Sequence, residues 1–343
     1  MDFSFVIRTY NEGKFLDKTL ELINKLEGNF SKEVIIVDSE STDNTLEIAE
    51  KYNCKIIIVK RSEWTWGKAL NIGIENAKGK FIVILSGHSF IKNSDFLLQA
   101  KNFLQEENKI AAVYGKQFPI DEINPFEEFE YRNYYPDIEK FLMTNPKKKL
   151  IGISNACSII KKEIWEEVKY DEKAQSLEDS IWAKEVLSKG YKLIYSNKLS
   201  IYHSHIFDIS YLYKRYYWFI YYNLMENLNS KYLSNKKRIK NILKKFSYKY
   251  YLFFNKIYTK RAMIKFFQKK QYNIEEKLID CYLYIKYTAT YNAFKDFFIY
   301  KDKHPKTYLT LDVPDDIKEI ENLVKPLNVN SNKDFDSKKI QEL

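Results

Sequence analysis

The chain has 343 residues, of which 45% are hydrophobic, so it is long enough for one large domain or two ordinary ones with a substantial core. Its three cysteines are odd in number and far apart, which excludes a disulfide framework and a thiolate metal cluster and favours a reducing compartment. The amino terminus lacks a signal-peptide pattern, and no stretch approaches the roughly 20 uncharged apolar residues of a membrane-spanning helix. We therefore expect a cytoplasmic protein, unless its surface holds it at the inner face of the plasma membrane.

The net charge of +10 is concentrated in one region. Residues 211–270 contain sixteen lysines and arginines against one acid, Glu226, so the remainder of the chain is mildly acidic. The positive charge therefore needs a local explanation.

Strands and helices are predicted to alternate in the first 93 residues. Short apolar runs predict strands at 3–7, 33–37, 55–59 and 81–85. Apolar residues at helical spacing predict helices between these strands, and Ser41, Thr42 and Asp43 form a good helix start. This alternation is typical of a parallel sheet covered by helices.

The pattern of residues 94–205 is less regular. Helices are predicted at 94–107, 162–168 and 178–189, and strands at 110–114, 151–160, 192–195 and 199–203. Residues 119–149, rich in proline and aromatic residues, predict an irregular excursion over the site. Beyond His205 the sequence predicts long helices.

Polar residues follow the carboxyl ends of several predicted strands. Parallel sheets bind their ligands outside these ends. Asp38 can accept hydrogen bonds from a nucleobase or a ribose hydroxyl. Asp38 and Asp43 can also both cap the next helix, but one acid suffices for a cap, so we favour a ligand role for Asp38. Lys68 and Asn71 open the third helix, where Lys68 would reach a diphosphate or remain a solvated surface charge.

Three histidines also follow predicted strands. His88 ends the sequence Ser86-Gly87-His88, in which Gly87 allows a close approach to the backbone. His203 and His205 alternate, so they point the same way. Two or three of these histidines are candidate ligands of Mn²⁺ or Mg²⁺, and imidazole favours Mn²⁺. The alternative for His88 is a hydrogen-bonded structural histidine.

Glu178 and Asp179 begin a predicted helix. The helix dipole stabilises the charged form of a carboxylate there, so such a group would be ready to take a proton from a substrate hydroxyl. The alternative, helix capping, needs only one of the two.

These motifs, in this order, resemble the family 2 glycosyltransferases, which have the GT-A fold and invert the configuration of the transferred sugar. The matching residues are 6–12, 37–45, 67–73, 154–156, 178–179 and 190–192, within a region of about 3–205. The resemblance implies a Rossmann-like α/β fold, with a mixed, mainly parallel sheet flanked by helices. We expect a catalytic domain at 1–205, with a nucleotide-binding half at 1–93 and an acceptor half at 94–205. A basic helical extension at 206–311 and a polar tail at 312–343 would follow.

The resemblance also implies a reaction and its residues. A sugar would pass from a UDP or dTDP donor to a hydroxyl of a glycan or lipid-linked acceptor in surface polysaccharide synthesis. The residues expected to bind the nucleotide sugar are Thr9, Tyr10, Asn11, Glu12, Asp38, Ser41, Lys68, Asn71, Ser86 and Gly87. The residues expected on the acceptor side are Ser154, Asn155 and Trp182, with Asp179 as the base and Glu178 orienting the acceptor. Mn²⁺ or Mg²⁺, held by His88, His203 and His205, would stabilise the leaving diphosphate.

The chain departs from the family where Ser86-Gly87-His88 replaces the metal-binding Asp-x-Asp. The histidine can still bind a metal, as in the Asp-x-His variant of the polypeptide N-acetylgalactosaminyltransferases, but the first carboxylate is lost. The element is similar to that of rhamnosyltransferase-like members. This similarity favours a deoxysugar nucleotide as the donor. The loss of the carboxylate leaves open whether transfer requires a metal.

Two questions stay open. The basic segment 211–270 fits either a surface that lies on an anionic membrane or a helical extension with packed aromatic residues and solvated lysines, and no nucleic-acid partner is expected. The alternative function is a catalytically weak nucleotide- or glycan-binding protein with the same fold, against which the joint presence of Asp38, Lys68, His88 and Asp179 argues. A nucleotidyltransferase would open with a Gly-rich phosphate loop, which residues 9–12 do not form.

Overall fold

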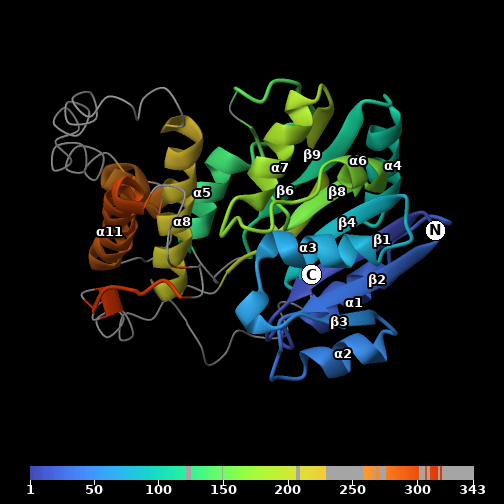
Figure 1. Cartoon of the computed structure of the whole chain (residues 1–343), viewed down its shortest axis with the longest axis horizontal. Coiled ribbons are helices and arrows are strands. Elements are labelled where there is room, and N and C mark those ends of the chain that lie inside the picture. The colour runs from blue at the N-terminus through green and yellow to red at the C-terminus, as the bar shows by residue number, and fades with distance from the viewer. Residues whose placement is uncertain are drawn as a thin grey trace. The chain divides into compact units, whose positions relative to one another are not determined.

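The computed structural model describes residues 1–120, 125–148, 150–205, 209–228, 259–265, 267–269, 276–300, 306, 310–315 and 317–318 (Figure 1). The described residues up to His205 form one compact unit, and those from Ile209 onwards belong to a second.

The first unit is built on one sheet with helices against it (Figure 1). The strands are β1 Phe3–Thr9, β2 Lys32–Asp38, β3 Lys55–Ile58, β4 Phe81–Ser86, β5 Ser89–Ile91, β6 Ile110–Phe118, β7 Phe141–Met143, β8 Cys157–Lys161 and β9 Lys192–His203. The helices are α1 Leu16–Asn24, α2 Thr45–Lys51, the 3-10 turn η1 Arg61–Glu63, α3 Trp66–Glu75, α4 Phe96–Gln105, α5 Pro125–Tyr134, α6 Lys162–Glu167 and α7 Glu178–Ser188.

The sheet is mixed, with strand order β3-β2-β1-β4-β8-β6-β9-β5 and β7 beside β9. The strands β3, β2, β1 and β4 run parallel, and β6 is parallel to β9. The strand β8 is antiparallel to both β4 and β6, and β9 is antiparallel to β5 and β7. The predicted α/β fold with a mixed sheet and flanking helices is confirmed, and its parallel part is the run that the alternation in residues 1–93 predicted.

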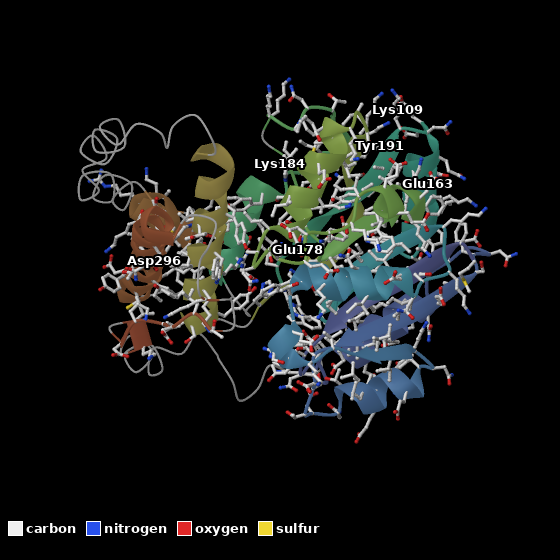
Figure 2. The ribbon with its side chains drawn as sticks, viewed as in Figure 1. Lys109, Glu163, Glu178, Lys184, Tyr191 and Asp296 are labelled. Atoms are coloured by element: carbon white, nitrogen blue, oxygen red, sulfur yellow. The ribbon has the colours of Figure 1, made fainter. Side chains whose placement is uncertain are left out.

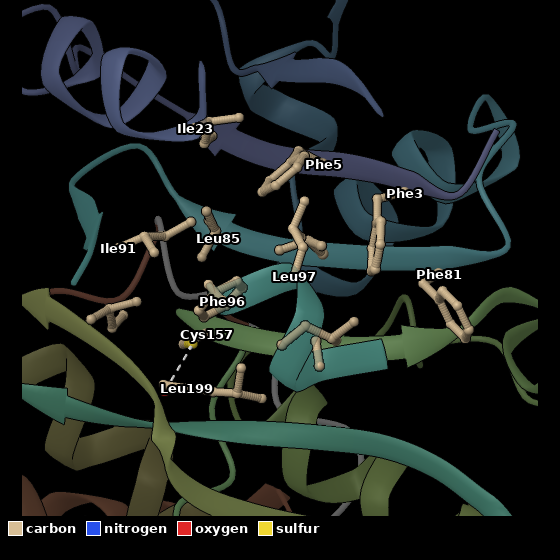
Figure 3. Packing of buried hydrophobic residues seen from close by; sticks show 14 of the residues in the cluster. Phe3, Phe5, Ile23, Phe81, Leu85, Ile91, Phe96, Leu97, Cys157 and Leu199 are labelled. Carbon is tan, nitrogen blue, oxygen red and sulfur yellow. Dashed lines mark hydrogen bonds between the residues drawn. The ribbon is translucent and has the colours of Figure 1, made fainter. Parts of the chain in front are cut away.

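Alternating side chains of β1 enter different cores, because successive residues of a strand point to opposite faces. Phe3 and Phe5 pack with Leu85 and Leu97 on one face, as Figure 3 shows. Val6 belongs to the core on the other face, where α3 lies. A Cβ atom at Gly73 of α3 would lie 2.4 Å from Val6 Cγ1, so this glycine permits close packing of α3 on β1.

The parallel strands bring the expected polar residues to one edge of the sheet. Thr9 lies beside Asp38 at the carboxyl ends of β1 and β2, and Arg8 lies beside Ser86 of β4. Ligands of such sheets bind outside these ends. The register therefore defines the edge at which the candidate site lies.

Several predicted elements in residues 94–205 differ in the structure. The strand predicted at 151–160 is confined to β8, and the two strands predicted at 192–195 and 199–203 are one strand, β9, whose register against β6 shifts. Residues 119–149, expected to be irregular, contain α5 and β7. The short strands β5 and β7 both pair with β9. Three-residue strands carry too little periodicity to be recognised locally, and pairing with β9 creates them.

The second unit contains α8 (Ile209–Leu228) and α11 (Glu276–Tyr300), which pack against each other. Five aromatic side chains of α8 are buried, those of Tyr213, Tyr216, Tyr217, Trp218 and Tyr221, and Trp218 is only 1% exposed. The hydroxyl groups of Tyr216 and Tyr282 lie 2.8 Å apart, and the Tyr217 hydroxyl donates to Asp296 at 2.7 Å. For α8, these contacts favour the explanation of packed aromatic residues over a membrane surface.

The membrane alternative rests on residues that the structure describes only in part. Residues 229–258 of the basic segment and most of the polar tail at 312–343 lie outside the described residues. Within the described part of the chain, no helix has the length and apolar composition needed to cross a lipid bilayer.

Candidate functional site

Asp38 ties together the loops at the carboxyl ends of β1 and β2. Its carboxylate is fully buried and accepts hydrogen bonds from Thr9 Oγ1 at 2.7 Å, from Ser41 N at 2.7 Å and from Ser41 Oγ at 2.6 Å. Asp43 accepts instead from Thr45 N, in the first turn of α2. Asp43 therefore serves the start of the helix, and Asp38 braces the edge of the sheet.

Asn11 braces the same loops through its backbone and its side chain. Its backbone adopts the left-handed conformation, with a φ of 54°. The backbone nitrogen of Asn11 donates to Ser41 Oγ at 2.8 Å, and its side-chain Oδ1 accepts from Thr42 N at 2.8 Å. The neighbouring Tyr10 ring is 42% exposed, and the guanidinium of Arg61 lies 3.5 Å from its centre. Tyr10 thus presents an aromatic surface beside Asp38. Arg61 carried no motif signal and was not predicted as part of the site.

The two candidates on α3 differ in their surroundings. Lys68 lies near the surface, where its Nζ pairs with Glu63 at 2.7 Å. Asn71 is only 5% exposed and uses its whole hydrogen-bonding capacity inside the protein. Its Oδ1 accepts from Trp165 Nε1 and Tyr170 N, and its Nδ2 donates to Tyr170 O and Glu172 Oε1. The side chain of Asn71 therefore holds the segment before α7 in place, and its expected nucleotide contact stays a prediction.

The three candidate metal ligands come together. His88 follows β4, His203 ends β9 and His205 follows it, and their candidate ligand nitrogens all lie within 4.8 Å of one another. The rings of His88 and His203 stack with 4.8 Å between their centres. We call these residues the histidine cluster. The antiparallel pairing of β5 with β9, which places Ser89 beside His203, creates it.

Polar partners orient the rings of the histidine cluster through their Nδ1 atoms. His88 Nδ1 lies 2.9 and 3.0 Å from the two carboxylate oxygens of Glu12. His205 Nδ1 lies 2.9 Å from Glu127 Oε1, and His203 Nδ1 lies 3.3 Å from the Tyr131 hydroxyl. A metal would therefore be bound through the Nε2 atoms, and His88 Nε2 is buried with no hydrogen-bond partner among the described residues. Carboxylates that orient histidine ligands in this way are usual at metal centres, so the residues present fit a divalent ion.

Glu12, expected to contact the nucleotide, is engaged by His88 instead. Gly87 makes this contact sterically feasible, because a Cβ atom there would lie 2.7 Å from Glu12 Cγ. Burial is the largest influence on the pKa of His88 and lowers it, but the charges of Glu12 and Glu127 and the hydrogen bond with Glu12 outweigh it and leave the pKa raised.

Glu178 and Asp179 occupy the first turn of α7, where Figure 2 labels Glu178. Glu178 is 6% exposed and pairs with Arg8 of β1, whose Nη1 lies 3.1 Å from Glu178 Oε1. Asp179 accepts from Ser180 N at 2.6 Å and from Asn155 N at 3.4 Å. Arg8, which the motifs did not single out, thus connects Glu178 to the edge where Ser86 lies.

The protonation of Asp179 differs from the expectation. The sequence predicted a carboxylate whose charged form the helix dipole stabilises, but burial and the neighbouring charge of Glu178 raise the pKa of Asp179 to about 7. Both influences disfavour the ionised form. A carboxylate with this pKa is well matched to accept a proton near neutral pH.

Two of the three expected acceptor residues are structural. Trp182 is 1% exposed, its Nε1 donates to Val168 O at 2.6 Å, and its ring stacks on Tyr170. Asn155 is also 1% exposed, and its side chain donates to Glu178 and accepts from Ser158 Oγ. Both side chains are buried by contacts within the protein, and their expected acceptor contacts stay predictions. Ser154 is partly exposed, and its Oγ accepts from Ala156 N at 3.2 Å.

Known proteins are similar to this chain in sequence. The family model described as glycosyl transferase family 2 matches residues 4–169, just under half of the chain. The O-antigen chain rhamnosyltransferase WbaN of Salmonella anatum is 28% identical over 222 residues, which cover 63% of this chain and 70% of that protein. The poly(ribitol-phosphate) β-N-acetylglucosaminyltransferase TarS of Staphylococcus aureus is 33% identical over 133 residues, which cover 35% of this chain and 22% of TarS.

Solved structures share the fold. The mannosyltransferase PcManGT from Pyrobaculum calidifontis matches with a TM-score of 0.51 at 18% identity, over 66% of this chain and 64% of that chain. Residues 1–349 of TarS match with a TM-score of 0.50 at 17% identity, over 87% of this chain and 92% of that chain. Residues 4–169 therefore match glycosyl transferase family 2, and the first unit has the GT-A fold of these solved enzymes.

Proposed function

We propose that the chain is an inverting glycosyltransferase that moves a sugar from a UDP or dTDP donor to a hydroxyl of a glycan or lipid-linked acceptor in surface polysaccharide synthesis. The observation that carries the proposal is Asp179, a carboxylate with a pKa of about 7 that Arg8 and Glu178 connect to the carboxyl-end edge of the sheet. The names of WbaN and TarS support surface polysaccharide synthesis, and WbaN supports a deoxyhexosyl donor.

In this reaction Asp179 is the base. Its carboxylate takes the proton of the acceptor hydroxyl while the hydroxyl oxygen bonds to the anomeric carbon. The bond from that carbon to the diphosphate oxygen breaks, and the diphosphate leaves with the electron pair. Attack opposite the leaving group inverts the anomeric configuration. Because the base must be ionised, transfer should rise with pH through about 7 and fall below it.

The nucleotide would lie against the loops braced by Asp38. Tyr10 offers an exposed ring for the base, and Thr9, Asn11 and Ser41 hold the surrounding backbone. Ser86 and Gly87 would face the diphosphate. Lys68 would have to leave Glu63 to reach it. On the acceptor side, Ser154 would contact the acceptor.

His88, His203 and His205 would hold a divalent cation through Nε2. Mn²⁺ suits this set better than Mg²⁺, which prefers oxygen ligands. When bound, such an ion would act as a Lewis acid that stabilises the charge of the leaving diphosphate. Glu12 and Glu127 would orient two of the ligands.

A thermal-shift panel of UDP, dTDP, GDP and CMP, each with Mn²⁺ and with EDTA, tests donor and metal together. We expect one nucleotide to stabilise the protein, and more strongly with Mn²⁺. Equal stabilisation with Mn²⁺ and with EDTA would show that nucleotide binding needs no metal. The absence of a shift with every nucleotide would favour a protein without transferase activity.

The variant Asp179→Asn tests the base. We expect transfer to be lost while the nucleotide-induced thermal shift remains. The matched control is Asp17→Asn, which removes an acid from an exposed ion pair of α1. Loss of both transfer and nucleotide binding would make Asp179 structural, and retained transfer would refute its role as the base.

A further inference from the structure

Arg8 occupies a position between the two halves of the site. It lies in β1, beside Ser86 of β4, and its side chain is only 10% exposed. Its Nη1 donates to Glu178 Oε1 at 3.1 Å, and its Nη2 lies 3.5 Å from the carbonyl oxygen of Asn155. A buried guanidinium is charged at all relevant pH values, so its location fixes a positive charge at this point.

The contacts of the two neighbouring carboxylates are unequal. Glu178 Oε1 receives the guanidinium of Arg8 and also Asn155 Nδ2 at 3.3 Å. Asp179 receives backbone N–H groups, from Ser180 and Asn155. Two adjacent buried carboxylates repel each other, and the one paired with a cation retains its charge more readily. The arrangement therefore directs a proton to Asp179 and away from Glu178.

Few other groups compete with this pair. The titratable groups that face Asp179 are Glu178 of α7, Arg8 of β1, Tyr114 of β6 and Tyr170 of the segment before α7. Burial raises the pKa of both tyrosines well above their ordinary value, so their hydroxyls remain neutral. Among the described residues, the charges with the largest effect on Asp179 are thus those of Glu178 and Arg8.

We propose that Arg8 is a positioning residue, whose ion pair with Glu178 leaves Asp179 as the carboxylate that exchanges a proton with the acceptor hydroxyl. This inference rests on the proposed function, in which Asp179 is the base. Glu178 is then the partner of Arg8, rather than a group that orients the acceptor.

The pH profile of kcat/KM tests the inference, because the two charges act on Asp179 with opposite signs. Arg8→Gln removes the positive charge, so the pH below which kcat/KM falls (the acid limb) should rise by about one unit, with about five-fold lower activity at pH 7 that recovers at higher pH. Glu178→Gln removes the negative charge, so the limb should move down. Arg8→Lys keeps the charge and should return the limb towards that of the wild type.

Controls separate this inference from a structural role. Arg132→Gln, which removes a charge from the exposed side of α5, should leave the profile unchanged. The nucleotide-induced thermal shift should persist in Arg8→Gln. A uniform loss of activity across the pH range, with the limb in place, would make Arg8 merely structural. The melting temperature of Arg8→Lys shows whether the site still folds.

Different results would refute Asp179 as the base and Arg8 as its positioning residue. If the wild-type enzyme has no acid limb near pH 7, or if Asp179→Asn retains transfer, the proposed base is wrong. If the limb is present and depends on Asp179, but Arg8→Gln and Glu178→Gln leave it in place or move it in the same direction, only the role of Arg8 is refuted.

Discussion

The variant Asn71→Ala decides whether this residue serves the fold or the nucleotide. Asn71 makes four hydrogen bonds with Trp165, Tyr170 and Glu172, at 2.9 to 3.0 Å. Truncation to alanine would leave Trp165 Nε1 and the backbone N–H and C=O of Tyr170 without these partners. Each of these three unsatisfied buried groups costs about 1–3 kcal/mol, so we expect the free energy of unfolding to fall by about 3–9 kcal/mol.

Urea denaturation measures this loss, and calorimetric titration with the stabilising nucleotide measures binding by the fraction that remains folded. The matched control is Asn76→Ala, at the exposed end of the same helix, where the side chain contacts Ile72 O and Lys55. We expect the control to cost less than about 1 kcal/mol, since exposed hydrogen bonds exchange with water. A variant Asn71→Ala that is as stable as the wild type but binds nucleotide ten-fold more weakly would refute the structural assignment.

Two further variants probe other contacts. Trp182→Phe keeps a buried aromatic ring but removes the N–H that donates to Val168 O. Thermal denaturation should therefore show a loss of about 1–3 kcal/mol in the free energy of unfolding, while the KM for the acceptor stays unchanged. A raised KM at wild-type stability would instead support the predicted acceptor contact. Glu12→Gln removes the charge beside His88 Nδ1 and should weaken Mn²⁺ binding, measured by calorimetry, about ten-fold, and unchanged affinity would show that Glu12 does not support a metal ligand.

Local patterns in the sequence determined most of the first 93 residues. The apolar runs predicted β1, β2, β3 and β4, and helical spacing predicted the helices between them, because both signals repeat within a few residues. The polar residues at the ends of these runs meet at one edge, since parallel pairing aligns carboxyl ends. The prediction of a family 2 glycosyltransferase fold followed from these motifs and is confirmed.

Only the tertiary structure decided what each polar side chain contacts. Asn71 and Trp182 looked like site residues in their motifs, but segments distant in sequence bury them. Arg8 and Glu178 are separated by 170 positions, so no local pattern could indicate their ion pair. The same holds for the raised pKa of Asp179, because burial and neighbouring charges depend on elements that only the folded chain brings together.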